Sequence, residues 1–220
     1  MKTSTLAFET THWDEVPEIV LAGVDEAGRG CLAGPVYAGA VSMPRAVAER
    51  FYEGDLVGLT DSKQLSESQR DEYFQKISEH PEIAFATGVC TAAEIDHLNI
   101  LAATHLAMRR ALEALPVQVG FALVDGLPVQ GLPVPSQAIV KGDSKSFLIA
   151  AASVVAKVSR DRYMTELAKR YPQYGFEIHK GYGTKLHMEA LFRYGATPEH
   201  RHTFRPVRDV EESLPGLFSC

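Results

Sequence analysis

A long helix with one face of very small residues constrains the fold of this chain more than any other feature. The helix is predicted within residues 144–171 (SKSFLIAAASVVAKVSRDRYMTELAKRY). Asp143 or Ser144 is its candidate N-cap, and Pro172 ends it. The face directed at the core consists of small side chains, namely Ala150, Ala151, Ala152, Ser153 and Ala156. Because small side chains let two backbones approach closely, this pattern predicts a helix lying tightly against a β-sheet.

Short apolar segments rich in β-branched residues are expected to form that sheet. The first two strands, at residues 19–25 and 36–43, are separated by a glycine-rich turn and should be neighbours. Three more strands are predicted, at residues 82–90, 119–125 and 137–140. Amphipathic helices are predicted at residues 66–78, 99–115 and 185–194. This order predicts an α/β fold in which helices flank one sheet, with a small helical appendage at the C-terminal end.

Length, hydropathy and cysteine content bound the class of protein. The 220 residues suit one compact domain, for which we expect an N-terminal extension at residues 1–18, a main domain at 19–207 and a tail at 208–220. No apolar run approaches the roughly 20 residues of a membrane helix, and the N-terminal residues do not resemble a signal peptide. Three widely spaced cysteines indicate neither a disulfide framework nor a zinc knuckle. We therefore expect a soluble, cytoplasmic and monomeric protein without membrane contact.

Charge is distributed unevenly along the chain. Residues 1–140 contain 9 Lys and Arg against 19 Asp and Glu, whereas residues 141–208 contain 13 against 6. The formal net charge of −6 therefore conceals one strongly basic stretch. A metal-dependent enzyme acting on nucleic acid needs both groups, because lysines neutralise phosphates and carboxylates hold the metal. Two solvated faces of opposite charge would give the same counts, so the motifs must decide.

Four carboxylates lie where functional sites collect. Asp25 and Glu26 end one predicted strand, Asp125 ends another, and Asp161 lies within the long helix. Adjacent acids on a regular strand point to opposite faces, so Asp25 and Glu26 can share a site only if the backbone turns there. Crowded carboxylates repel one another unless a divalent cation binds them, and oxygen ligands favour magnesium or manganese over zinc. The alternative for Asp161 is an ordinary ion pair with Lys157.

The glycines after the first strand allow a second interpretation. Gly28, Gly30 and Gly34 are spaced as GxGxxxG, one residue longer than the dinucleotide-binding fingerprint, and no helix pattern begins at Gly30. We instead expect the two glycines around Arg29 to let the backbone approach a nucleic-acid strand. Cys31 could be a nucleophile, but its small neighbours favour an inert thiol.

Five blocks of sequence, in order, resemble the signature motifs of the ribonuclease HII family, the type 2 ribonucleases H. The blocks are VDEAGRGCLAGPV (24–36), DSKQLSESQR (61–70), LVDG (123–126), KGDSKSFLIAAASVVAKVSRDR (141–162) and HKGYGTKLHMEALFRYGATPEHRHTF (179–204). The resemblance extends from about residue 19 to about residue 207. The related ribonuclease HIII family usually has a long N-terminal extension, lacks GRG and has a glutamate as its fourth acid, so the HII family fits better.

The resemblance implies a ribonuclease H-like fold, with a central mixed β-sheet flanked by helices and a small helical C-terminal part. It implies an endonuclease that hydrolyses the RNA strand of RNA/DNA hybrids and incises 5′ to ribonucleotides embedded in duplex DNA, a step of ribonucleotide excision repair. The catalytic acids and metal ligands carried over from the motifs are Asp25, Glu26, Asp125 and Asp161. The implied cofactors are two magnesium or manganese ions about 4 Å apart. The implied products carry 3′-hydroxyl and 5′-phosphate ends.

Further residues are expected to bind the substrate. By resemblance, the GRG turn at residues 28–30 contacts the 2′-hydroxyl at the ribonucleotide to DNA junction, and Tyr182 stacks on the sugar that follows. The 2′-hydroxyl is the only group that distinguishes ribose from deoxyribose at that position. Neighbouring phosphates are expected to contact Lys63, Lys145 and Ser146.

Two other functions remain open at this point. A non-catalytic nucleic-acid-binding module could use the basic stretch alone, although it would leave four acids near a polyanion. A transposase or junction resolvase of related fold would cut DNA that lacks ribonucleotides. The C-terminal residues EESLPGLFSC resemble the short peptides with which replication proteins bind the sliding clamp, so a weak clamp contact is a candidate, while a frayed end is the simpler interpretation.

Overall fold

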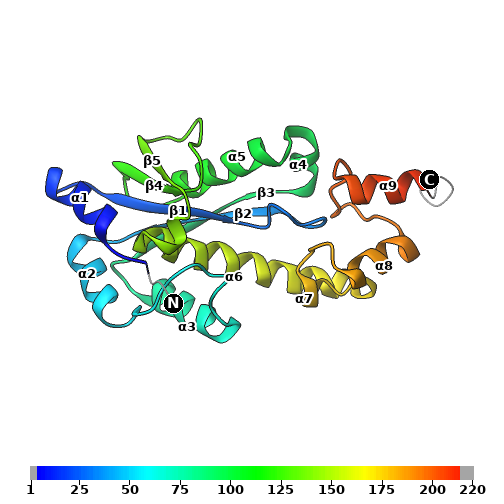
Figure 1. Ribbon diagram of the computed structural model, residues 1–220, viewed down its shortest axis with the longest axis horizontal. Helices are drawn as coiled ribbons and strands as arrows, with labels where there is room; N and C mark the ends of the chain where they lie inside the picture. Colours follow the sequence, from blue (N-terminus) through cyan, green and yellow to red (C-terminus); the bar gives the residue numbers. More distant parts are fainter. Residues whose placement is uncertain (1–3, 214–220) are drawn as a thin grey trace.

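Five strands form one mixed β-sheet in the computed structural model, which describes residues 4–213 (Figure 1). The strands are β1 (Leu21–Ala27), β2 (Val36–Ser42), β3 (Ala84–Cys90), β4 (Phe121–Asp125) and β5 (Ser136–Ile139). Their order across the sheet is β3-β2-β1-β4-β5. The first three strands are antiparallel neighbours, whereas β4 lies parallel to β1, and β5 parallel to β4. The expected α/β sheet is confirmed, with β1 at its centre.

Helices cover both faces of the sheet. α5 (Ile100–Glu113) packs mainly against β3 and β2 on one face, and α6 (Phe147–Arg170) crosses β1 and β2 on the other (Figure 1). A Cβ atom on Gly39 of β2 would overlap the carbonyl oxygen of Ala152 in α6, so the two backbones touch there. The prediction of a small-residue helix lying tightly against the sheet is therefore confirmed.

The start of α6 differs from the predicted start. Its N-cap is Ser146, whose hydroxyl oxygen accepts the Ile149 N–H at 3.2 Å, rather than Asp143 or Ser144. The preceding residues, Gly142–Ser144, form a short 3₁₀ helix, η1. Asp143 thus has no capping role at α6, and Ser146 is fully buried at the end of the helix.

Several short helices are not revealed by the apolar pattern of the sequence. α3 (Glu67–Glu79) is predicted correctly, with both hydrogen bonds of the Ser66 and Gln69 capping box present. Apart from the four-residue α7 (Phe176–His179), the helices missing from the sequence-based prediction are α1 (Ala7–Glu15), α2 (Arg45–Glu53), α4 (Ala92–Leu98) and α9 (Arg205–Ser213). Each has seven to nine residues, too few for an apolar repeat to stand out. Across residues 4–213, no helix combines the length and apolar character needed to span a membrane.

The expected helical appendage lies at one end of the molecule (Figure 1). It comprises η2 (Pro172–Tyr174), α7 (Phe176–His179), α8 (Lys185–Tyr194) and α9. Leu191 of α8 packs with Val207 and Val210 of α9. The boundary predicted at residue 207 therefore falls within a packed helix.

The described part of the predicted N-terminal extension packs against the main domain. Trp13 of α1 is only 2% exposed and belongs to the same apolar core as the first turns of α6. Glu9 is fully buried, and its Oε1 accepts hydrogen bonds from the Leu148 N–H at 2.9 Å and from the Ser146 hydroxyl at 2.6 Å. The carboxylate of α1 thereby satisfies a backbone donor in the first turn of α6.

The close approach of α6 to β1 makes a testable prediction about stability. A Cβ atom on Gly23 would overlap the Leu148 backbone, which cannot move aside as a side-chain end could. We expect Gly23→Ala to lower the free energy of unfolding by about 1–3 kcal/mol or more. The control is Gly120→Ala, whose nearest contact would be a flexible side chain at 3.3 Å and whose effect should stay below about 1 kcal/mol. Equal effects in denaturant unfolding would contradict the tight packing.

Candidate metal centre and nucleic-acid cleft

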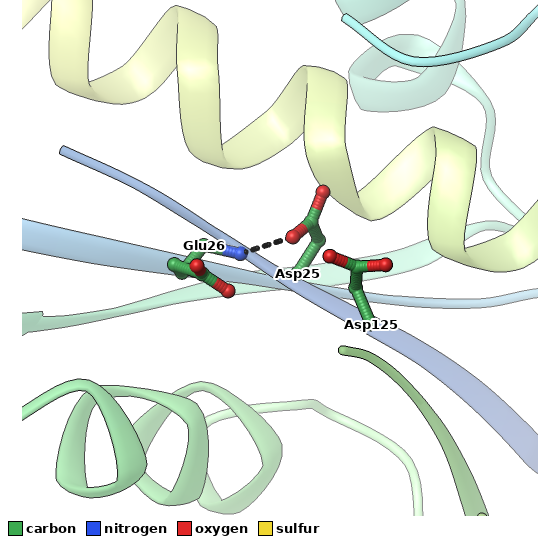
Figure 2. A group of neighbouring side chains, drawn as sticks. All are labelled: Asp25, Glu26 and Asp125. Carbon is green, nitrogen blue, oxygen red and sulfur yellow. Dashed lines mark hydrogen bonds between the residues drawn. The ribbon is translucent and has the colours of Figure 1, made fainter. Parts of the chain in front are cut away.

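Three carboxylates meet at the neighbouring ends of β1 and β4 (Figure 2). Asp25 and Glu26 belong to β1, Asp125 is the last residue of β4, and one oxygen of each lies within 4.8 Å of the others. The Glu26 backbone N–H donates to Asp25 Oδ1 at 2.7 Å, which orients that carboxylate. A group of oxygen ligands at this spacing could hold a hard divalent cation such as magnesium or manganese.

The register between β1 and β4 brings Asp25 and Asp125 together, because Val24 pairs with Val124 and the two acids are the next residues on neighbouring strands. β1 and β4 are paired from Leu21 to Val24 of β1, and β1 then continues to Ala27 after β4 has ended. In Figure 2 Asp25 points toward α6, whereas the Glu26 side chain leaves the strand in another direction. The expectation that the backbone must turn at these two residues is wrong, since the strand stays regular through both.

Burial and mutual repulsion act on the pKa values of the group. Burial raises the pKa of Asp25 well above its usual value, and the charges of Glu26 and Asp125 raise it further. Burial also raises the pKa of Glu26, although the nearby Arg29 guanidinium opposes that effect. For Lys63, burial lowers the pKa, but surrounding carboxylates, Asp25 first among them, raise it above its usual value. A bound divalent cation would favour the ionised carboxylates and so reverse the effect on Asp25.

Asp161 does not lie in this group. Gly39, the partner of Asp25 in the β-sheet register, faces Ala152 and Ala156 of α6. Asp161 lies five residues beyond Ala156, a rise of about 7.5 Å along the helix axis. Its Oδ1 accepts a hydrogen bond from Lys157 Nζ at 2.7 Å, the ion pair that the spacing allows. Asp161 also lines a different cleft, of about 640 Å³. The structure therefore does not bring this expected ligand to the other three.

Asp143 lies beside the three acids instead. The Gly142 N–H donates to Asp125 Oδ1 at 2.6 Å, which holds η1 against the end of β4. Burial, and then the charges of Asp61 and Asp125, raise the pKa of Asp143 to about 6, and Asp143 in turn raises the pKa of Asp25. In the sequence, Asp143 is interpreted as a helix N-cap, so it is not identified as a candidate metal ligand. Its position after the predicted strand 137–140 is the signal that could have identified it.

The GRG turn lies next to the acids and is held from beneath by a buried arginine. Arg29 is half-exposed and its Nη1 lies 3.3 Å from Glu26 Oε1. The guanidinium of Arg201 is fully buried and donates to the carbonyl oxygens of Gly28 at 2.7 Å, Arg29 at 2.8 Å and Gly34 at 2.9 Å. Gly28 has a φ of 95°, and a Cβ atom there would overlap the Arg160 side chain. This position therefore requires glycine.

Tyr182 lies on a second loop that is tied to the GRG segment. The Leu32 N–H donates to the Gly181 carbonyl at 2.8 Å, and Arg160 donates to the carbonyl oxygens of Ala33 and Lys180. Tyr182 itself is 40% exposed, so its ring is available to a ligand. Arg201 does not stand out in the sequence, because a buried arginine that donates to backbone carbonyls has no local pattern.

The expected phosphate-binding residues fall into two groups. Lys63 and Lys145 line an open cleft of about 670 Å³ together with Asp125 and Asp143, and both lysines are exposed. Ser146 is fully buried, and its hydroxyl donates to Glu9 while capping α6. The expectation that Ser146 contacts phosphate is not met in the structure, because its hydroxyl serves the α1 to α6 contact.

The raised pKa of Asp143 predicts how pH affects the metal-free protein. Because the folded state holds this proton more tightly than the unfolded chain, the group costs stability as pH rises through about 6. In a chelator at pH 8, we expect the free energy of unfolding of Asp143→Asn to exceed that of the unsubstituted protein by about 1–2 kcal/mol. At pH 4 the two proteins should differ little. Denaturant unfolding across this range measures the difference. A difference that does not change with pH would contradict the placement of Asp143 among the acids.

Comparisons with known proteins agree with this geometry. A family model described as Ribonuclease HII matches residues 22–207. The ribonuclease HII of Geobacillus kaustophilus is 52% identical over 197 residues, which cover 90% of this chain and 72% of the relative. The ribonuclease H2 of Pyrococcus horikoshii OT3 superimposes with a TM-score of 0.76 at 29% identity, over 90% of this chain and 100% of that chain. Bst-RNase HIII, solved in complex with Mn²⁺, shares the fold with a TM-score of 0.71 at 18% identity, over 89% of this chain and 70% of that chain. The chain therefore belongs to the ribonuclease HII family, whose members cleave the RNA of RNA/DNA hybrids, and is a ribonuclease H enzyme.

Proposed function

We propose that this enzyme hydrolyses the RNA strand of RNA/DNA hybrids and also incises 5′ to single ribonucleotides embedded in duplex DNA, leaving 3′-hydroxyl and 5′-phosphate ends. The observation that carries the proposal is the group of Asp25, Glu26 and Asp125 beside the GRG turn. Family membership supplies the reaction, and the site supplies a place where a phosphate backbone and a ribose would be held together.

The metal ligands we propose are Asp25, Glu26, Asp125 and Asp143, with Asp143 in place of Asp161. Carboxylates alone suit magnesium or manganese, and the manganese complex of the related HIII enzyme supports that choice. Two bound ions would supply an activated water and would stabilise the charge that develops on the departing 3′ oxygen. Within the protein, Arg29 holds the Glu26 carboxylate and Gly142 holds the Asp125 carboxylate, so both ligands are oriented before a cation binds.

The GRG turn is the element that we propose to recognise the ribose. Arg201 donates hydrogen bonds to the carbonyl oxygens of Gly28 and Arg29, which orients the peptide groups of the turn. A Cβ atom on Gly30 would meet no heavy atom within 4 Å, so a sugar can approach the backbone there. A polar site built to bond a 2′-hydroxyl leaves its own groups unpaired with a deoxyribose, which disfavours that substrate. Tyr182, on the adjoining loop, would stack on the following sugar.

Phosphate contacts are proposed for Lys63 and Lys145, which face the cleft that contains Asp125. The clamp contact, the monomeric state and the cytoplasmic location stay predictions. The clamp-like residues of the tail, 214–220, lie outside the described residues.

Product mapping on a duplex with one ribonucleotide tests the proposed reaction. We expect a single incision 5′ to the ribonucleotide with magnesium or manganese, none with a chelator, and none on the all-DNA duplex. Asp25→Asn should abolish incision while the protein stays folded, because the substitution removes a repelled buried charge rather than a core contact. Full activity in the chelator, or cleavage of the all-DNA duplex, would contradict the proposed reaction.

The choice between Asp143 and Asp161 as fourth ligand has its own test. We expect Asp143→Asn to lower kcat on an RNA/DNA hybrid by at least about 100-fold, as loss of a group that stabilises the reacting centre does. The matched substitution Asp161→Asn should cost less than about tenfold, since it breaks only an ion pair on one helix. The reverse order would restore Asp161 as a ligand.

A further inference from the structure

The loop that carries Tyr182 rests on buried histidines that the proposed mechanism does not use. His187 of α8 and His200 are both fully buried, and their Nε2 atoms are 3.0 Å apart. At the far end, His200 Nδ1 lies 3.0 Å from the Thr197 backbone nitrogen and 2.9 Å from its hydroxyl oxygen. At the near end, His187 Nδ1 lies 3.0 Å from the Tyr182 carbonyl oxygen. These four residues form one hydrogen-bond chain, which runs from Thr197 through His200 and His187 to Tyr182.

The partners at the two ends determine the tautomer of each ring. A backbone N–H can only donate, so His200 Nδ1 accepts from Thr197 and the proton of this ring is on Nε2. His200 therefore donates to His187 Nε2, which leaves the His187 proton on Nδ1. A carbonyl can only accept, and Nδ1 of His187 duly donates to the Tyr182 carbonyl. Every bond in the chain thus has one donor and one acceptor, and all point toward Tyr182.

Both rings must stay neutral for this arrangement, because a second proton on either would set two N–H groups against each other. Burial lowers the pKa of His187 to about 4 and that of His200 to about 3. The chain is therefore intact at neutral pH. A parallel contact supports the same loop, since the Gly181 N–H donates to Nδ1 of His179, whose ring stacks on His187 at 4.5 Å.

The tip of the Tyr182 side chain lies next to the GRG segment. Burial raises the pKa values of the Tyr182 hydroxyl and of the Cys31 thiol, and each group also affects the pKa of the other. Cys31 follows the GRG turn and is fully buried, so the tip of the ring has a neighbour fixed in that segment, while its backbone is bonded to the appendage through His187. A partly exposed ring whose backbone is held can be set in one place before a substrate arrives, which lowers the entropy lost on binding.

We propose that His187 and His200 are positioning residues for substrate selection, which act by setting the place of the Tyr182 ring through the Tyr182 carbonyl. This inference rests on the proposed role of Tyr182 at the ribonucleotide to DNA junction. It assigns to the helical appendage a part in choosing the substrate, although none of its buried histidines touches nucleic acid.

Two substitutions at His187 separate positioning from simple stability. In His187→Asn the amide nitrogen can reach the place of Nδ1 and still donate to Tyr182, while the His200 N–H loses its acceptor. In His187→Gln the amide oxygen can reach the place of Nε2 and accept from His200, while the histidine bond to Tyr182 is lost. The Tyr182 carbonyl keeps a second donor, the Thr184 N–H at 2.8 Å, so His187→Gln leaves neither original partner of His187 unpaired. We therefore expect His187→Gln to be at least as stable as His187→Asn.

The readout is selectivity, defined as kcat/KM on a duplex with one ribonucleotide divided by kcat/KM on an RNA/DNA hybrid. The loss of one positioning hydrogen bond should make His187→Gln about three- to tenfold less selective, while His187→Asn should stay within about twofold of the unsubstituted enzyme. Selectivity would then fall in the more stable variant. If selectivity instead follows thermal stability across the two variants, the histidines are structural only and the proposal is overturned.

A double-mutant cycle tests whether the effect passes through Tyr182. In a Tyr182→Ala background, His187→Gln and His187→Asn should have equal selectivity, because no ring remains to be positioned. A further loss from His187→Gln in that background would place the action of the chain elsewhere. For the tip of the side chain, Cys31→Ser should keep the selectivity that Cys31→Ala loses, and equal losses would remove the thiol contact from the account.

A measurement without substrate separates this inference from the proposed function. In protein labelled with ¹³C-tyrosine, the Tyr182 ring resonances are assigned by their disappearance in Tyr182→Phe. We expect these resonances to move or broaden in His187→Gln and to stay in place in His187→Asn. If the enzyme failed to incise the ribonucleotide duplex, the proposed function would fall, while the ring resonances would still decide the positioning claim. Unchanged resonances in both variants would overturn that claim.

Discussion

Repulsion among carboxylates at the neighbouring ends of β1 and β4 is the constraint on which the rest of this structure depends. Asp25 is nearly buried against α6, and Glu26 and Asp125 lie within ligand distance of it. Such a group is stable only if protons, cationic side chains or bound cations offset the charge. The raised pKa of Asp25 shows that a proton can offset part of this charge, and the cationic side chains of Arg29 and Lys63 offset a further part. A divalent cation would offset the same charge, and in the proposed reaction it would also supply the chemistry of hydrolysis.

The GRG and Tyr182 loops are held together by two buried guanidinium groups. Arg160 and Arg201 are almost fully buried, and they donate hydrogen bonds to backbone carbonyls of the GRG and Tyr182 loops. Burying a cation is costly unless hydrogen bonds satisfy it, and each arginine has at least three. The same bonds tie two irregular loops into one rigid surface beside the acids. The proposed selection of a ribose by its 2′-hydroxyl would need that rigidity, because a loop that yields would accept deoxyribose as well.

The sequence predicts the sheet, the long helix and three of the four acids that we now place at the centre, because each rests on a local rule. Apolar strands end in acids, and the alanines of α6 mark its contact with the sheet. Local rules fail where one residue suits two roles. Asp143 can cap a helix as readily as it can bind a cation, and Asp161 fits a motif although its ion pair with Lys157 holds it elsewhere. The buried histidine chain and the role of Ser146 depend on partners more than ten residues away, so no spacing pattern could reveal them.

Anomalous scattering from manganese in crystals of the enzyme is the sharpest test of the proposed carboxylate site, because it locates the cation without reference to activity. We expect manganese bound between Asp25, Glu26 and Asp125, with Asp143 as the fourth protein carboxylate nearest to it. Manganese bound at Asp161 alone, or no manganese at the ends of β1 and β4 at saturating concentration, would contradict this placement.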